Sequence, residues 1–282
     1  MGSIVWLASY PRSGNTWTRN FLHNLVSILR GEPEAEQDIN AMQKLTTWDV
    51  YPFWWKGILE KPLEEASNAE VAALRPRVHA RIAGEATGIV FVKTHNALVA
   101  SHGVPAINMK VTSGAIYIVR NPLDVAISNA HHFALSLDEA IERLNRPGLE
   151  VHNHKDGAFE VYGAWRENVL SWTRRPHRTI YVMRYEDMLA RPEETFGRLA
   201  YHLTLLPTAA QLEQAIERSA FERLKRQEAE KDFAERPKRA REFFREGRAE
   251  QWREILSEAQ VRAVVAPNRE QMARFGYLPE GF

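Results

Sequence analysis

The chain has 282 residues, of which 44% are hydrophobic and 26% are charged, an ordinary balance for a soluble globular protein. Its formal net charge of +1 argues against a nucleic-acid-binding protein that works by bulk electrostatics, so an anion site must be local. The absence of cysteine excludes disulfides, thiolate catalysis and Cys-ligated zinc.

Short apolar runs alternate with amphipathic patterns along the chain. Runs without polar alternation are typical of buried parallel strands, and we expect such strands at 4–8, 89–92, 115–119 and 179–183. The helical patterns between them cover residues 16–29, 122–133, 137–144, 159–172 and 192–202. This alternation predicts one α/β domain over residues 1–282, a central parallel sheet flanked by helices. In such folds ligands bind beyond the carboxyl ends of the strands.

Two segments interrupt this alternation, and a third is rich in histidine. Residues 45–63 hold three Trp, one Tyr and one Phe, which form either an acceptor-pocket wall or a satellite core. Residues 217–253 are dense in charge and are broken by Pro237 and Gly247, which predicts solvated helices and loops with a few residues turned inward. The His-x-His within residues 151–157 has no third metal ligand near it in sequence, so we interpret that segment as a mobile lid.

The first expected strand runs into the first helix through residues 9–14. In such a join the N–H groups of residues 13–16 would point into one small space, where the helix dipole favours an anion. Arg12 would add a full charge, and Ser13 and Thr16 would add hydroxyl donors. The chain lacks both G-x-x-x-x-G-K-[ST] and G-x-G-x-x-G, which argues against an ordinary kinase or ATPase. A capped turn without a ligand is the alternative.

The segment YPRSGNTW (10–17) resembles the 5′-phosphosulfate-binding loop of the cytosolic-type sulfotransferases. These enzymes move a sulfonate group from 3′-phosphoadenosine 5′-phosphosulfate (PAPS) to an acceptor. The family loop usually reads YPKSGTTW, so Arg12 and Asn15 depart from it, and the Arg variant resembles bacterial members. Further similarities follow in the family's order: FVKTHNA (91–97), AIYIVRNPLDVAISNAHHF (115–133) and FFREGRAEQW (243–252), with weaker ones at YVMRYEDM (181–188) and SAFERL (219–224). Together they cover about residues 4–275 and imply a P-loop-like fold.

The resemblance implies a role for each matched residue. Arg12 and Lys93 would stabilise charge on the leaving phosphate oxygen, and His95 would be the general base. The 5′-phosphosulfate ligands would be Arg12, Ser13, Gly14, Asn15 and Thr16; the 3′-phosphate ligands Arg120, Ser128, Arg245, Glu246 and Gly247; and the adenine contacts Trp17, Tyr185, Ser219 and Phe221. Structural readings remain open: a strand-end cap for His95, a helix start for Arg120, and packing for Ser128 and Trp17.

We therefore predict a cytoplasmic PAPS-dependent sulfotransferase (EC 2.8.2 type) that needs no metal. It would sulfonate a hydroxyl, or an amine, of a small molecule and release the desulfonated donor, PAP. A P-loop-like nucleotide or small-molecule kinase is one alternative, disfavoured by the missing Walker lysine. A non-catalytic PAP- or nucleotide-binding relative is another, disfavoured by the presence of Lys93 and His95 beside Arg12.

The sequence predicts neither a nucleic-acid partner nor a membrane partner. No apolar stretch approaches the roughly 20 residues of a membrane span, and the run 4–8 is too short for a signal peptide. The family's dimer motif, a Lys followed by Thr-Val and then Glu, is not reproduced in residues 253–262, which leaves monomer and homodimer both open. The pair His131 and His132 faces either the acceptor or the surface.

Overall fold

A parallel sheet of five strands forms the centre of the computed structural model, which describes residues 2–32, 38–236 and 242–282. The strand order is β2-β3-β1-β6-β9, and every neighbouring pair is parallel. The strands are β1 (Ser3–Ser9), β2 (Thr46–Trp48), β3 (Ile89–Thr94), β6 (Thr112–Val119) and β9 (Ile180–Arg184). The predicted α/β class with a central parallel sheet is confirmed.

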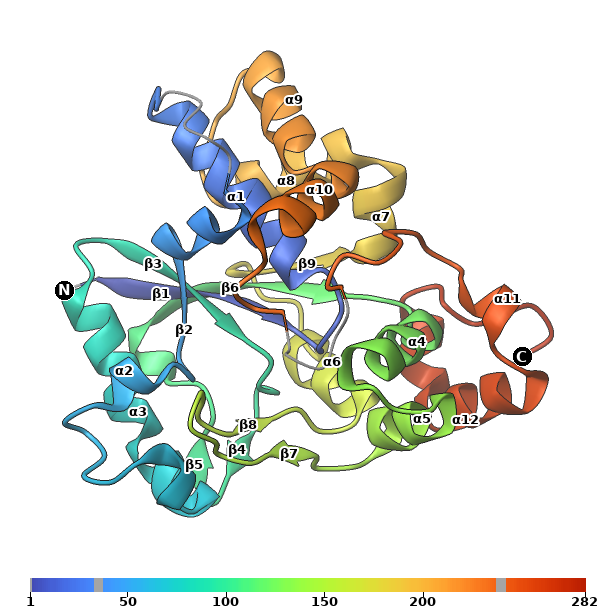
Figure 1. Cartoon of the computed structure of the whole chain (residues 1–282), viewed down its shortest axis with the longest axis horizontal. Helices are drawn as coiled ribbons and strands as arrows, with labels where there is room; N and C mark the ends of the chain where they lie inside the picture. The colour runs from blue at the N-terminus through green and yellow to red at the C-terminus, as the bar shows by residue number, and fades with distance from the viewer. Residues whose placement is uncertain (1, 33–37, 237–241) are drawn as a thin grey trace.

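Helices cover both faces of this sheet (Figure 1). Successive residues of a strand point to opposite faces, so Val5 and Leu7 of β1 pack into one layer and Ile4 and Trp6 into the other. The first layer contains α1 (Asn15–Leu29), α7 (Tyr185–Ala190), α8 (Pro192–His202) and α9 (Ala209–Arg218). The second contains α3 (Asn68–Glu85), α4 (Pro122–Phe133), α5 (Leu137–Asn145), α6 (Trp165–Thr173) and α12 (Glu258–Arg274).

Shorter elements connect these layers. They are α2 (Pro52–Trp55), α10 (Phe221–Lys231), α11 (Trp252–Ile255), the 3-10 turns η1 (Ile39–Lys44), η2 (Leu63–Glu65) and η3 (Met109–Val111), and the two-stranded ribbons β4 (Ala100–Ser101) with β5 (Val104–Pro105) and β7 (Glu150–Val151) with β8 (Glu160–Val161). Four of the helices, α3, α5, α9 and α12, directly follow a Ser or Thr whose side chain accepts a hydrogen bond from the third residue of the helix, which explains where these four start.

The helix predicted over 159–172 is wrong in its first six residues. Residues Glu160–Val161 instead form β8, and α6 begins at Trp165. Gly163 has φ +64°, a left-handed conformation that a helix interior does not tolerate, and the Glu167 side chain accepts from the Ala164 N–H at 2.9 Å. The strand β2, inside the aromatic segment 45–63, was not predicted at all.

The charged segment 217–253 folds largely as expected in the part that the structure describes. The helix α10 turns Leu224 and Glu228 inward, and Phe233 and Phe244 complete a small third core with Ile39 of η1. The predicted break at Pro237 lies outside the described residues.

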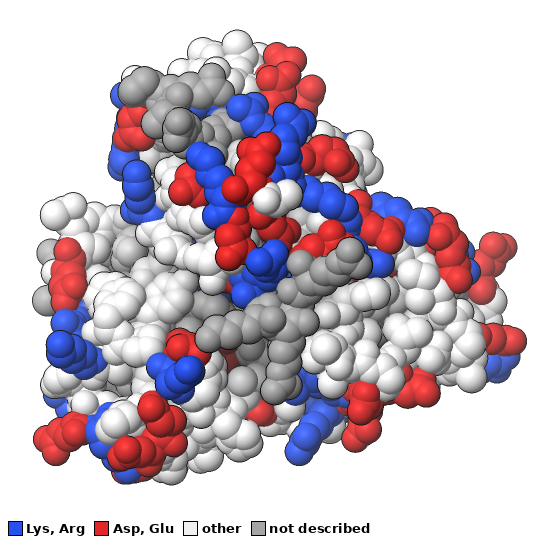
Figure 2. Space-filling model, viewed as in Figure 1, with Lys and Arg blue, Asp and Glu red and all other residues white. Residues whose placement is uncertain are grey.

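The charges on the face drawn in Figure 2 are mixed in sign, with basic and acidic side chains interleaved rather than gathered into one basic patch. No helix in the described ranges is both long enough and apolar enough to cross a membrane.

Candidate active site

All five strands of the sheet deliver residues to one cavity at their carboxyl ends. Its volume is about 330 Å³. Pairing sets Trp48 beside Lys93, Ala8 beside Thr94, and Val119 beside Arg184, so the strand ends lie nearly abreast. The residues lining the cavity immediately at or after those ends are Trp48 (β2), Lys93 and His95 (β3), Arg12 and residues 14–17 (β1), Arg120 (β6) and Tyr185 (β9). This is the edge where open parallel sheets bind ligands.

The turn between β1 and α1 is held in an unusual shape. Gly14 has φ +103°, and a Cβ there would lie 2.8 Å from the ring of Tyr185. Arg12, with φ +67°, holds a left-handed conformation that costs a non-glycine residue about 1–2 kcal/mol. The Asn15 amide donates to the Leu7 carbonyl at 2.8 Å and so ties the turn to its own strand.

The N-terminus of α1 has no side-chain cap, in contrast to α3, α5, α9 and α12. The positive end of this 15-residue helix therefore meets the cavity without a protein side chain to satisfy it. Beside it, the buried Ser13 Oγ has no hydrogen-bond partner among the described residues. These features make the turn suited to an anionic group.

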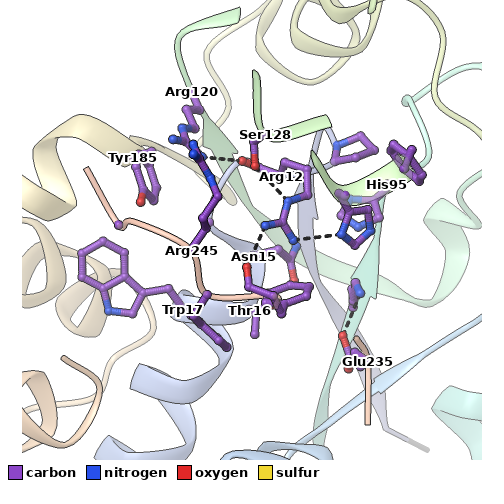
Figure 3. A pocket seen from close by; sticks show the side chains of 18 of the residues that line it. Arg12, Asn15, Thr16, Trp17, His95, Arg120, Ser128, Tyr185, Glu235 and Arg245 are labelled. Atoms are coloured by element: carbon purple, nitrogen blue, oxygen red, sulfur yellow. Dashed lines mark hydrogen bonds and ion pairs between the residues drawn. The ribbon is translucent and has the colours of Figure 1, made fainter. Parts of the chain in front are cut away.

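Three arginines, Arg12, Arg120 and Arg245, line the cavity (Figure 3). Arg12 donates to Ser128 Oγ at 3.0 Å and to the Phe243 carbonyl at 3.0 Å. Arg120 donates to the Arg12 carbonyl at 3.0 Å, while Arg245 contacts Gln251 and, at 3.0 Å, Glu246. Burial and then the neighbouring Arg120 charge lower the pKa of Arg12 to about 10, so Arg12 is still cationic at neutral pH.

Residues 243–247 also line the cavity, and α10 holds the start of this segment in place. Glu228 accepts from the N–H groups of Phe243 at 2.6 Å and Phe244 at 2.9 Å. Gly247 has φ +61°, and a Cβ there would lie 2.3 Å from the Phe221 ring, so only glycine allows this approach. Residues 243–247 are called the clamp below.

His95 lies on the opposite side of the cavity from Arg120 and Arg245, with Arg12 between them (Figure 3). Its Nδ1 is 2.8 Å from the Ser9 carbonyl oxygen, which only accepts, so we assign the proton to Nδ1. Nε2 then carries the lone pair. Burial and the nearby Lys93 ammonium lower the pKa of His95 to about 3, so the imidazole is neutral at neutral pH.

Two carboxylates lie against these residues, and sequence reasoning missed both. Glu235 forms a 2.9 Å ion pair with Lys93. Glu160, buried under the site, accepts from the His95 N–H at 2.8 Å and from Trp48 Nε1 at 3.2 Å. Burial and, next, the charge of Asp49 raise the pKa of Glu160 to about 7. Neither carboxylate belongs to a sequence motif, and the only signal for them is that a buried Lys needs a counter-charge.

Most predicted site residues line the cavity, and a few do not. Those that line it are Arg12, Gly14, Asn15, Thr16, Trp17, Lys93, His95, Arg120, Ser128, Tyr185, Phe221, Arg245, Glu246 and Gly247. Ser13 lies buried just behind it. Ser219 is outside it, because its hydroxyl donates to the Ala215 carbonyl at 2.7 Å and accepts from Asn24 at 3.2 Å.

Of the aromatic segment 45–63, Trp48 lines the cavity, Trp55 is buried in the core and Phe53 is exposed. Trp48 and Tyr162 line the cavity and make T-shaped ring contacts with His95, with centroids 5.8 and 5.9 Å away. His132 also lines it, whereas His131 is exposed. His154 lines the cavity from a tight turn closed on Gly157. Within the described ranges no three His, Asp or Glu side chains are grouped to hold a metal ion.

The comparisons with known proteins agree on one family. A family model described as the sulfotransferase domain matches residues 3–276. Cytosolic sulfotransferase 15 of Arabidopsis thaliana is 25% identical, over 93% of this chain and 70% of its own, and flavonol 3-sulfotransferase of Flaveria bidentis is 24% identical, over 92% and 78%. Among solved structures, retinol dehydratase in a complex with retinol and PAP has a TM-score of 0.66 at 24% identity, covering 95% of this chain and 81% of that one. Mouse sulfotransferase SULT7A1 complexed with PAP has a TM-score of 0.62 at 18% identity, covering 96% and 84%.

Proposed function

The chain belongs to the sulfotransferase domain family, and we propose that it transfers a sulfonate group from PAPS to a hydroxyl of a small molecule and releases PAP. The observation that carries the proposal is the meeting, at one sheet edge, of an uncapped helix N-terminus, an arginine cluster and a neutral histidine. The first two suit an anionic donor, and the third suits proton removal from an acceptor.

The buried donors of the cavity fit a ligand with two phosphate-type groups. Ser13 Oγ, Trp17 Nε1 and Arg120 Nε are all shielded from solvent and find no hydrogen-bond acceptor in the described parts of the chain. Buried polar atoms are normally satisfied, so each of these favours an acceptor atom brought by a ligand. The turn 12–16 would hold the 5′ end of PAPS, and Arg120, Ser128 and the clamp would hold its 3′-phosphate.

The adenine would lie among Trp17, Tyr185 and Phe221. Trp17 and Tyr185 meet edge to face, with centroids 5.8 Å apart, and all three line the cavity. Ser219 is not among the lining residues and would contribute only through its hydrogen bond with Asn24 on α1.

When PAPS is bound, its sulfonate sulfur is the electrophile and its 5′-phosphate is the leaving group. Arg12 and Lys93 would stabilise negative charge that builds on the leaving oxygen, as fixed cations do in phosphoryl transfer. His95 would take the acceptor's proton on Nε2, because Nδ1 already donates to the Ser9 carbonyl. The protonated ring would then share the positive charge with that carbonyl through the same hydrogen bond.

The walls near His95 favour an aromatic or otherwise apolar hydroxyl compound. Trp48 and Tyr162 are in contact with His95, and Phe133 and Val151 also line the cavity, so these walls suit apolar groups and aromatic rings rather than charge. One relative is called a flavonol 3-sulfotransferase, and one structural neighbour holds retinol, which supports hydroxylated apolar acceptors for this chain as well. An amine acceptor would use the same proton acceptor. The protein would act as a monomer or homodimer, in the cytoplasm, without nucleic acid, membrane or metal.

Calorimetry with PAP tests the donor site first. We expect micromolar binding to the wild type and a loss of binding in Arg120→Ala. The second assay follows sulfonate transfer from PAPS to a panel of phenols, alcohols and amines. In this assay His95→Ala should lose transfer yet bind PAP as the wild type does. PAP binding by the wild type without transfer to any acceptor would favour a non-catalytic nucleotide-binding relative. No PAP binding at all would refute the proposal and favour a kinase-like protein.

A further inference from the structure

Glu235 forms an ion pair with the proposed catalytic lysine, Lys93. It follows α10 on a short turn that Phe233 anchors in the third core. Asn40 of η1 ties the same turn in place, donating to the Asp232 carbonyl at 3.2 Å and accepting from the Ala234 N–H at 2.9 Å. Through this turn the Glu235 side chain reaches the cavity with only 6% of its surface exposed.

Both carboxylate oxygens of Glu235 are engaged. Oε1 is 2.7 Å from Arg19 and 3.4 Å from the Tyr51 hydroxyl, while Oε2 is 2.9 Å from both Lys93 Nζ and Arg19. Arg19 and Tyr51 therefore hold the carboxylate in place independently of Lys93. The charges of Arg19, Lys93 and Glu235 add up to +1, so the group as a whole remains cationic toward the cavity.

Burial opposes the positive charge on Lys93, and the Glu235 carboxylate in contact with it favours that charge. The Lys93 side chain is 7% exposed, and burial opposes the ammonium form, which lowers its pKa. The groups that face it are Glu235 and Glu160, which favour the charged form, and Arg19 and the neutral His95 on the other elements packed around it. Of the two carboxylates, Glu235 is the one in direct contact, and the Trp48 ring lies 3.5 Å from Nζ on another side.

We propose that Glu235 is a positioning residue of the transfer reaction, which keeps the Lys93 ammonium charged and aimed into the cavity. The role of Lys93 rests on the proposed function, whereas the charge on Lys93 does not. The opposite possibility is that Glu235 blocks Lys93 and must leave before the donor binds.

The test compares Glu235→Gln with Glu230→Gln, an exposed residue of α10 that loses the same charge. The first readout is an NMR titration of the lysine 13Cε signals without donor or acceptor, with the Lys93 signal assigned by its loss in Lys93→Arg. We expect the Lys93 pKa to fall by about 1–3 units in Glu235→Gln, since it loses a charge partner in contact. In Glu230→Gln it should not move. Glu235→Asp, which keeps the charge but shortens the reach, should lie between the two.

The second readout is the pH profile of sulfonate transfer. A charged Lys93 is required, so activity falls as pH rises through its pKa, and this alkaline limb should move to lower pH in Glu235→Gln. A shift of 1–3 units corresponds to a roughly 10- to 1,000-fold loss at a pH above both values. An unchanged Lys93 titration would refute the proposal even if transfer is never observed. Higher activity in Glu235→Gln would instead establish Glu235 as a blocking residue.

Discussion

Replacing Glu160 with Gln measures how much the buried carboxylate beneath His95, the proposed general base, lowers the free energy of unfolding. Glu160 is 3% exposed, and its Oε1 accepts from the His95 N–H and from Trp48. Its Oε2 lies 3.4 Å from the Tyr162 hydroxyl. A glutamine of the same shape can keep both hydrogen bonds to Oε1 and turn its amide N–H toward the Tyr162 oxygen. The substitution therefore removes a charge while leaving the packing in place.

The size and sign of the effect follow from the raised pKa. The pKa of Glu160 is about 7 in the folded chain against an ordinary value of 4.5. The folded state thus binds the proton more tightly, and the stability this gives is present below pH 4.5 and lost as pH rises to 7. The difference of about 2.5 units corresponds to roughly 3 kcal/mol. Glu160→Gln cannot titrate, so it should gain about that much stability relative to wild type between these two pH values.

Urea unfolding at pH 4.5, 6 and 8 measures this difference directly. The free energy of unfolding of Glu160→Gln minus that of the wild type should rise with pH by roughly 3 kcal/mol, whatever its starting value. The exposed Glu230→Gln should give a flat difference. If the free energies of unfolding of Glu160→Gln and wild type differ by the same amount from pH 4.5 to 8, the pKa of Glu160 is not raised by folding. The reasoning about its burial is then wrong.

Two further substitutions test the clamp and a buried ion pair. Gly247→Ala puts a Cβ 2.3 Å from the Phe221 ring, so the clamp must shift to relieve this contact and about 1–2 kcal/mol of backbone strain, and calorimetry should show PAP binding weakened by about tenfold or more. Gly148→Ala, with φ +60° but open space around it, should bind PAP normally, and equal binding by both variants would contradict the close-approach argument. Asp49→Asn leaves Arg75, 2.5 Å away and buried, without its carboxylate, and should lower the free energy of unfolding by about 3–5 kcal/mol in urea. A loss below about 1 kcal/mol would mean that Arg75 finds other partners, whereas adding Arg75→Met should restore part of the stability.

The fold was predictable where local chemistry decides it. Four of the five strands are apolar runs because both faces of a parallel sheet are covered, and the sequence carries that signal directly. The strand β2 has three residues, Thr46–Trp48, which is too short for any periodicity. The first six residues of the helix predicted over 159–172 are not helical, because Gly163 and Glu167 set the helix start and hydrophobic periodicity does not report a backbone angle.

The candidate site was predictable where its residues lie within one contiguous segment of the sequence. The turn 10–17 and the strand ends at Lys93 and Arg120 each form a local pattern, and the sheet brings them together by register. Glu160 and Glu235 reach the site from a ribbon and from a turn far along the chain, so only tertiary structure reveals them. Ser219 was predicted from a matching segment, but it does not line the cavity. Its hydroxyl donates to the Ala215 carbonyl of the preceding helix, α9.

The cations on the two sides of the cavity differ in whether a carboxylate is in direct contact with them, and this difference fits a transfer reaction. On the donor side, the direct hydrogen-bond partners of Arg12 and Arg120 in the described structure are hydroxyl, imidazole and carbonyl groups, none of them a carboxylate. Within the described residues, neither guanidinium is therefore in direct contact with a carboxylate, which favours a ligand that brings its own anions. On the reacting side, Lys93 is paired with Glu235, which limits its attraction for ground-state anions and keeps it protonated. Binding strength would thus come from the arginines, and selective stabilisation of charge that develops during transfer from the tuned lysine.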